Sequence, residues 1–147
     1  MTLLPLLTAT ALGAPPDLSA WSSRTGLELA APADGHVQET PDGTAIVGAG
    51  ESLLLTTGQG PQQLDAALDS MSAPFVASGI AAPDPVDVPC EVAGRKATCR
   101  AIDLTIAPGA TLHLLAGQPH DADWLMVCLD RDPKRAGVCA GRIARTP

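Results

Sequence analysis

Aromatic side chains are nearly absent from this chain. Trp21, Phe75 and Trp124 are the whole aromatic set, 2% of 147 residues, and there is no tyrosine. Proteins that bind single-stranded nucleic acid stack bases on aromatic rings, and three scattered rings cannot provide such a platform. A net charge of −7 also repels phosphate. The composition therefore argues against nucleic acid as a partner, and it predicts a core of aliphatic side chains.

Basic residues are scarce in the first part of the chain. Residues 1–89 contain one, Arg24, beside ten acidic residues, whereas residues 90–147 contain eight basic and six acidic residues. Rigid loops that carry charge can recognise a partner of opposite charge, although exposed charges are more often simply solvated. An acidic protein or an envelope component is the partner that this pattern predicts. The candidate partner-binding residues lie near two turns: Arg95, Lys96 and Arg100, and then Arg131, Lys134 and Arg135.

A long apolar run is also missing. The apolar stretch at residues 1–14 is shorter than the roughly 20 residues of a membrane span, and it ends in small residues before Pro15. This pattern is typical of a secretory signal segment cleaved after Ala14, although no lysine or arginine lies near Met1. A first strand or an unstructured tail is the alternative. We expect a periplasmic or secreted protein, with a signal segment at 1–14, a linker or N-terminal arm at 15–24, and one domain at 25–147.

Four cysteines follow in the second part of the chain: Cys90, Cys99, Cys128 and Cys139. An even number of cysteines behind a signal segment indicates disulfides in an oxidising compartment. Three pairings are possible, and the spacing favours 90–99 with 128–139. Zinc sites and dithiol redox sites use cysteines two to four residues apart, and no such spacing occurs here. We therefore expect structural disulfides and no metal or cofactor.

The first pairing can be argued from hairpin geometry. If Gly94 and Arg95 form a two-residue loop, Cys90 and Cys99 oppose each other directly, with Cα atoms about 4.5 Å apart. Cys99 then has the opposite parity to Ile102, which requires a bulge near Ala101 or a disulfide on the outer face of the sheet. The second pair would fasten the end of a strand to the C-terminal tail.

The pattern of apolar residues predicts an α+β fold. Short strands are expected at 27–31, 44–47 and 52–57, followed by a helix that begins at Pro61 and ends before Pro74. Further strands are expected at 86–92, 97–106, 111–115 and 124–129. This order predicts an antiparallel sheet covered by one main helix, with both disulfides in the C-terminal half.

Residues 25–32, with the sequence TGLELAAP, are similar to the opening strand of PsbP-type domains, which also ends in proline. The order of the later elements, up to Leu129, resembles that family as well. These domains are small exported α+β proteins. The resemblance implies a binding or accessory role.

Motifs for catalysis are not found. The sequence has no Gly-x-Ser-x-Gly, and no serine, histidine and aspartate are linked by spacing. His120, Asp121 and Asp123, with His113 nearby, could form a surface metal site, but a solvated turn is the favoured interpretation. The leading hypothesis is a non-enzymatic binding or accessory domain without catalytic residues. The alternative is a small exported hydrolase with a site assembled from distant residues, which a pocket joining His113 or His120 to a carboxylate and a serine would favour.

Overall fold

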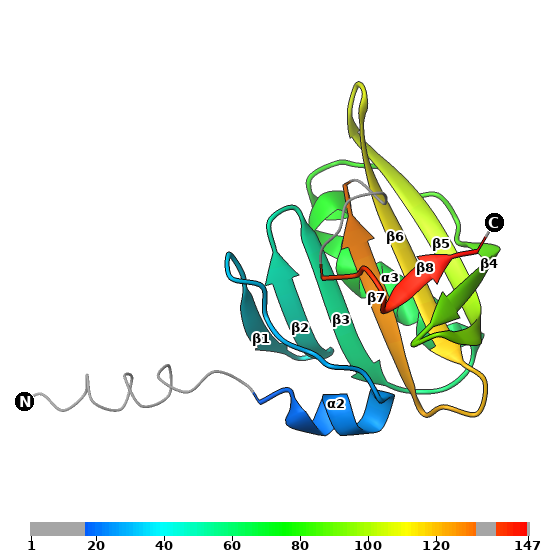
Figure 1. The fold of residues 1–147 in the computed structure, drawn as a ribbon. Helices are drawn as coiled ribbons and strands as arrows, with labels where there is room; N and C mark the ends of the chain where they lie inside the picture. The colour runs from blue at the N-terminus through cyan, green and yellow to red at the C-terminus, as the bar shows by residue number, and fades with distance from the viewer. Residues whose placement is uncertain (1–16, 132–137, 147) are drawn as a thin grey trace, which may run out of the picture.

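The computed structural model describes residues 17–131 and 138–146, and its main feature is one eight-stranded antiparallel sheet. The strand order is β1-β2-β3-β7-β6-β5-β4-β8. Figure 1 shows that the sheet curls into a half-barrel, with β8 in front of β6 and β7. The strands are β1 His36–Thr40, β2 Gly43–Gly48, β3 Glu51–Thr57, β4 Val86–Val92, β5 Arg95–Ala107, β6 Ala110–Pro119, β7 Trp124–Asp130 and β8 Ile143–Arg145.

Helix α3, Pro61–Ala77, covers the convex face of the sheet (Figure 1). Proline lacks an N–H, which is no loss at the first helical position, so the predicted start at Pro61 is confirmed. Leu64, Ala67 and Leu68 form the buried stripe and pack on aliphatic side chains of β5, β6 and β7. The predicted end before Pro74 is wrong, because the helix continues for three residues beyond it.

The concave face is closed by two separate pieces of chain, one of which begins with a short helix. They are helix α2, Ser19–Thr25, with the segment 26–35, and residues 138–146, called the C-terminal segment below. Trp21 joins α2 to the sheet by donating a hydrogen bond from Nε1 to Thr44 Oγ1 at 3.1 Å. Gly117 keeps the curl tight, since a Cβ there would lie 2.6 Å from Val92 Cγ2 and 2.8 Å from Cys99 Sγ.

The predicted α+β class is wrong. The described residues contain two helices, of 7 and 17 residues, against eight strands, so the protein is mainly β. The sheet buries its second face by curling and by packing α2, segment 26–35 and the C-terminal segment over it.

The expected boundaries near the N-terminus also need correction. Residues 27–31 are not a strand, and α2 lies partly within the expected linker at 15–24. The signal segment predicted at 1–14 lies outside the described residues. No helix among the described residues is long and apolar enough to cross a membrane.

Both predicted disulfides are present, Cys90–Cys99 and Cys128–Cys139. The predicted hairpin register is wrong, however. The turn consists of Ala93 and Gly94, with φ of 56° and 74°, so Cys90 opposes Ala97 and the two cysteines are diagonal neighbours, with Cα atoms 6.0 Å apart.

Cys99 and Ile102 project to opposite faces of the sheet. Neither a bulge near Ala101 nor a disulfide on the outer face is the explanation. The β5–β6 pairing is regular from residue 97 to residue 105, so there is no bulge near Ala101. Cys99 and Ala101 belong to the concave core, whereas Ile102 belongs to the convex core. Strand β5 is therefore buried on both faces there.

Candidate functional site

Four ionisable side chains form a row across the concave face. Asp103 of β5 is the register partner of His113 of β6, and His113 is also the partner of Asp130 of β7. Asp130 is in turn the partner of Glu51 of β3. Directly opposed residues of antiparallel strands project to the same face. These four residues, the polar row, therefore lie side by side on neighbouring strands.

The next row of side chains on the same face is apolar. It contains Ala101, Leu115, Cys128 and Leu53, each two residues along its strand from a member of the polar row. All four are buried in the concave core. Because side chains alternate between faces, the concave surface changes from apolar to charged in a single step.

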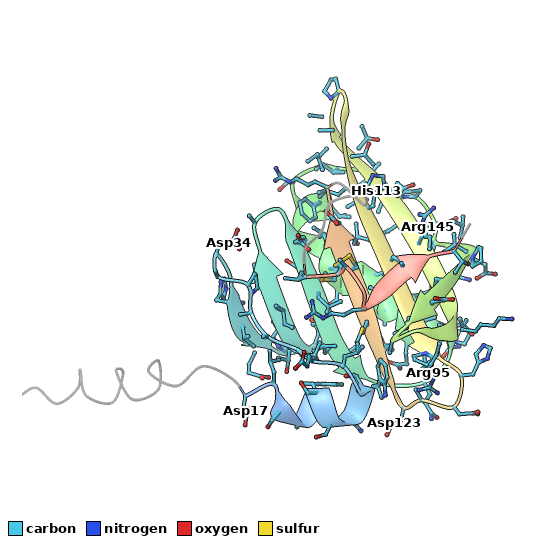
Figure 2. All side chains as sticks on the ribbon, viewed as in Figure 1. Asp17, Asp34, Arg95, His113, Asp123 and Arg145 are labelled. Atoms are coloured by element: carbon cyan, nitrogen blue, oxygen red, sulfur yellow. A yellow bond between two sulfur atoms is a disulfide. The ribbon has the colours of Figure 1, made fainter. Side chains whose placement is uncertain are left out.

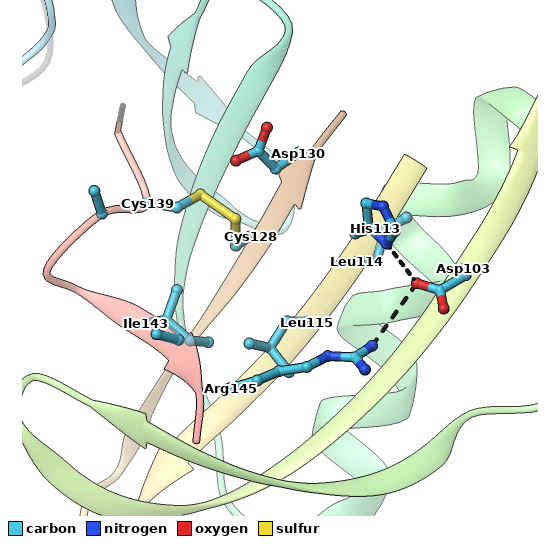
Figure 3. Close-up of a pocket in the computed structure, with 11 residues that line it drawn as sticks. Asp103, His113, Leu114, Leu115, Cys128, Asp130, Cys139, Ile143 and Arg145 are labelled. Carbon is cyan, nitrogen blue, oxygen red and sulfur yellow. Dashed lines mark hydrogen bonds and ion pairs between the residues drawn. A yellow bond between two sulfur atoms is a disulfide. The ribbon is translucent and has the colours of Figure 1, made fainter. Parts of the chain in front are cut away.

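A cleft lies where this change occurs, between the sheet and the C-terminal segment. Its volume is about 420 Å³. Leu115, Ile143 and the Cys128–Cys139 disulfide make its apolar side, and Figure 3 shows three polar-row residues together with Arg145 around it. The polar-row members that line the cleft are Asp103, His113 and Asp130.

Asp103 contacts two of the other polar side chains of the cleft. Its Oδ1 lies 2.9 Å from His113 Nδ1 and 3.7 Å from Arg145 Nη2 (Figure 3). The side chains of Asp103 and Arg145 are half-exposed, and that of His113 is 35% exposed. When Nδ1 is protonated and donates a hydrogen bond to the Asp103 carboxylate, the neutral ring keeps a lone pair on Nε2. The pair thus orients a hydrogen-bond acceptor.

The C-terminal segment is anchored at the far end of the polar row. Glu51 is buried, and its Oε1 accepts a hydrogen bond from the backbone N–H of Cys139 at 3.3 Å. The disulfide from Cys139 to Cys128 joins the same segment to the neighbouring strand. One covalent and one polar contact therefore fix the wall of the cleft.

The cleft has groups for binding, and its described lining offers no hydroxyl, lysine amine or free thiol as a nucleophile. The described residues that line it include no serine, threonine, lysine or tyrosine, and its cysteines form a disulfide. Within residues 17–131 and 138–146, no three histidine, cysteine, aspartate or glutamate side chains are placed to hold a metal ion. The arrangement can orient a polar head group over an apolar surface.

The described members of the two predicted basic groups lie at different places in the fold. Arg95 and Lys96 are exposed at the β4–β5 turn, where Arg95 Nη2 donates to the carbonyl oxygen of His120 at 2.9 Å. Arg131 is exposed after β7, whose register with β6 puts it at the opposite end of the sheet. Lys134 and Arg135 lie outside the described residues. Contact of Arg95 and Lys96 with an acidic partner stays a prediction.

Arg100 has partners within the protein. Its Nε lies 2.6 Å from Asp65 Oδ1 on α3, and its Nη1 lies 2.8 Å from Asp87 Oδ1 on β4. Desolvation works to lower the pKa of this guanidinium, but Asp65 and then Asp87 outweigh it and raise the pKa above its usual value. Arg100 therefore joins the helix to the sheet.

The His120 loop lies far from the cleft. Figure 2 shows Arg95 and Asp123 at the lower end of the molecule, whereas His113 and Arg145 lie toward its upper end. Asp123 forms an ion pair with Arg24 of α2 at 3.0 Å. Asp123 thus helps to hold α2 over the concave face.

The sequence singled out His113 as a candidate residue, but it did not indicate Asp103, Asp130, Glu51 and Arg145 as parts of the same site. Cysteine parity was the available signal. Asp103 lies four residues after a disulfide cysteine, and Asp130 lies two after another, so each shares a face with its cysteine.

Comparisons with protein-family models, with curated proteins and with solved structures find no match to this chain. The resemblance to PsbP-type domains stays a prediction.

Proposed function

We propose that this protein is an exported, non-enzymatic binding or accessory domain, periplasmic or secreted, that holds a small ligand in the cleft beside the polar row. Its two disulfides fit an oxidising compartment. The protein would have an accessory role if the bound group belongs to a larger partner, and a binding role if the ligand is a free small molecule. The same cleft would bind the group in either role.

The observation that carries this proposal is the lining of the cleft. Ligand pockets commonly have volumes of 300–1,000 Å³, a mainly apolar lining and a few convergent polar groups. The cleft has about 420 Å³, with Leu115 and Ile143 on its apolar side and the His113–Asp103 pair at its edge. This combination supports a small amphipathic ligand.

The hydrolase alternative receives less support. His113 does lie with carboxylates, as such a site requires, but the described lining contributes no serine, threonine or lysine, and its cysteines form a disulfide. A histidine–aspartate pair without a hydroxyl or thiol lacks the attacking group of triad-type hydrolysis.

A pair of matched substitutions tests the binding site. Ala140 is exposed and lines the cleft, so Ala140→Phe would fill it without entering a core. Ala66 is exposed on α3, and Ala66→Phe makes the same change on the opposite side of the sheet. We expect hexanol, a neutral amphipathic probe followed by NMR shift changes at Leu115 and Ile143, to bind the parent and Ala66→Phe and to bind Ala140→Phe at least tenfold more weakly. Equal binding to all three would refute this location of the site.

A further inference from the structure

We propose that the cleft binds an extended peptide segment, which adds as a strand to the free edge of β8 and places an uncharged aliphatic side chain in the cleft. This inference rests on the proposed function and assigns the chemical class of the ligand. It is drawn from the unpaired backbone groups of β8, from the course of the cleft along them, and from the charges beside the cleft.

Strand β8 has a neighbouring strand on one side only. It stands last in the strand order, and β4 is its single pairing partner among the described strands (Figure 1). An edge strand presents backbone N–H and C=O groups with which another chain can pair. The side of β8 that lies away from β4, called the free edge below, can therefore accept a further strand.

The hydrogen bonds on the β4 side show which backbone groups point to the free edge. The carbonyl oxygen of Arg142 accepts a hydrogen bond from the turn after β4 at 2.8 Å, and the N–H of Thr146 donates to the carbonyl oxygen of Pro89 at 3.0 Å. Residues 142 and 146 therefore face β4. Because antiparallel strands alternate between bonded and non-bonded pairs, Ile143 and Arg145 direct their backbone groups away from β4.

Three of the groups at the free edge have no hydrogen-bond partner within residues 17–131 and 138–146. The N–H of Ile143 is bonded, since it donates to the carbonyl oxygen of Cys139 at 3.2 Å. The C=O of Ile143 and the N–H and C=O of Arg145 are unpaired in that part of the chain. Ala144 and Arg145 are exposed, so a ligand can reach them. One donor and two acceptors in a row are what the backbone of an added strand complements.

The cleft runs along the free edge. Ile143, Ala144 and Arg145 all line it, as the close-up in Figure 3 indicates for β8. Successive side chains of a strand point to opposite faces, so a cleft that touches three consecutive residues borders the backbone itself. Leu115 and the Cys128–Cys139 disulfide form the apolar surface beside this backbone. An added strand would therefore bring one of its side chains onto that surface.

The charges beside the cleft favour an uncharged side chain. The carboxylate of Asp103 lies 2.9 Å from His113 Nδ1 and 3.7 Å from Arg145 Nη2. Asp130 is buried and has a partner as well. A charged ligand group would compete with these existing contacts, whereas an aliphatic side chain is stabilised by the apolar surface alone. We therefore choose leucine for the probe.

The probe is the blocked, uncharged peptide acetyl-Ala-Ala-Leu-Ala-Ala-amide. Two matched versions carry N-methyl groups, one on its second and fourth amino acids and the other on its third and fifth. NMR titration, followed at Ile143 and Arg145, gives the dissociation constants. Because a strand pairs with one neighbour through alternate residues, we expect one methylated version to bind at least tenfold more weakly than the parent peptide, and the other to bind like it.

The possible results separate this inference from the proposed function. Equal weakening by both methylation patterns, or no weakening by either, would overturn strand addition. Binding of hexanol in the same cleft would then leave the proposed function intact. No binding of the peptides or of hexanol would overturn both.

A pair of substitutions tests the free edge from the side of the protein. Arg145→Ala removes the guanidinium and keeps the backbone N–H, whereas Arg145→Pro removes both. Proline is tolerated on an edge strand where its nitrogen faces away from the sheet. We expect the peptide to bind Arg145→Pro about fivefold more weakly than Arg145→Ala, the effect of one hydrogen bond, and hexanol to bind both equally. The same ratio of peptide to hexanol affinity in both variants would contradict the proposal.

A second copy of the protein is the competing occupant of the free edge, since it could pair through its own β8. Sedimentation velocity measures the oligomeric state of the parent and of both variants, and we expect monomers throughout. A dimer that Arg145→Ala keeps and Arg145→Pro disrupts would show pairing between copies and would overturn the peptide as the ligand.

Discussion

The two faces of the sheet are closed in opposite ways. The convex face is covered by one continuous helix, α3, which follows β3 directly in the chain and buries Leu64 and Leu68 completely. The concave face is covered by pieces from both ends of the described chain, α2 with segment 26–35 and the C-terminal segment. Both disulfides belong to the concave core.

This difference shows what each kind of cover needs. A 17-residue helix presents a repeated apolar stripe, so hydrophobic burial alone can hold it. The C-terminal segment is too short for such a stripe, and its attachment combines the disulfide to Cys128, the hydrogen bond to Glu51 and three residues of β8. Cross-links and polar contacts therefore replace burial where the cover is short, and that is where the cleft is found.

The largest expected effect on stability comes from a cavity under α3. Leu68 is fully buried, so Leu68→Ala should lower the free energy of unfolding by about 3 kcal/mol, the middle of the range for such cavities. Urea unfolding followed by circular dichroism measures the change. Gln62→Ala, on the exposed side of the same helix, is the control and should have little effect. A loss below about 1 kcal/mol would mean that burial is not what holds α3.

The second test removes the cross-link of the concave cover. Replacing Cys128 and Cys139 together by serine should cost about 2–3 kcal/mol, because the loop that they close is short. The effect should be local as well: hydrogen exchange should accelerate in the C-terminal segment before it does in α3. Equal acceleration in both elements would show that the two covers do not differ in the way described.

A third test concerns the loops that position α3. Gln118 is buried; its Nε2 donates to the carbonyl oxygens of Gly58, Ala122 and Trp124, and its Oε1 accepts from the N–H of Gly60. Gln118→Leu leaves these groups without their partner and should cost about 1–3 kcal/mol in thermal or urea unfolding. Gln59→Leu, an exposed neighbour, should change stability far less. Equal effects of the two substitutions would contradict a role for the buried amide.

The smallest test concerns α2. The Asp17 carboxylate accepts hydrogen bonds from the N–H and hydroxyl of Ser19, each at 2.9 Å, and these bonds lower the pKa of Asp17 below its usual 3.8. The stabilisation is therefore present above pH 3.8 and is lost as the pH falls through the lower, folded value. NMR titration should show local loss of α2 structure there, and Asp17→Asn should remove that pH dependence. A carboxyl that titrates above 3.8 would contradict this assignment.

Much of the convex side could be predicted from the sequence because its signals are local. Pro61 and the leucine stripe identified α3, and alternation identified most strands of the sheet. Spacing alone identified the cysteine pairs, although the turn at Ala93 and Gly94 shifted the register. By contrast, α2 and β1 have five to seven residues each, too few for a clear period, and the α+β class was inferred from element order without the curl.

The candidate site could not be predicted because it depends on register between distant strands. Counted regularly from the turn at Pro108 and Gly109, Asp103 would oppose Leu114. The irregularity between Thr105 and Ala107 shifts the pairing by one residue, so that Asp103 opposes His113. No local pattern marks that shift. The polar row is thus a property of the folded sheet.

That irregularity also bears on how this fold can change in evolution. Odd-numbered and even-numbered residues of β5 and β6 project to different faces of the sheet. A single-residue insertion beside the cleft would therefore turn leucines to the face where carboxylates now lie, and carboxylates to the face of the leucines. Near the tip of the β5–β6 hairpin, which projects beyond the sheet in Figure 1, the unpaired Ile106 already accommodates an odd residue. We expect related chains to vary in length at this tip and to keep a constant length between it and the polar row.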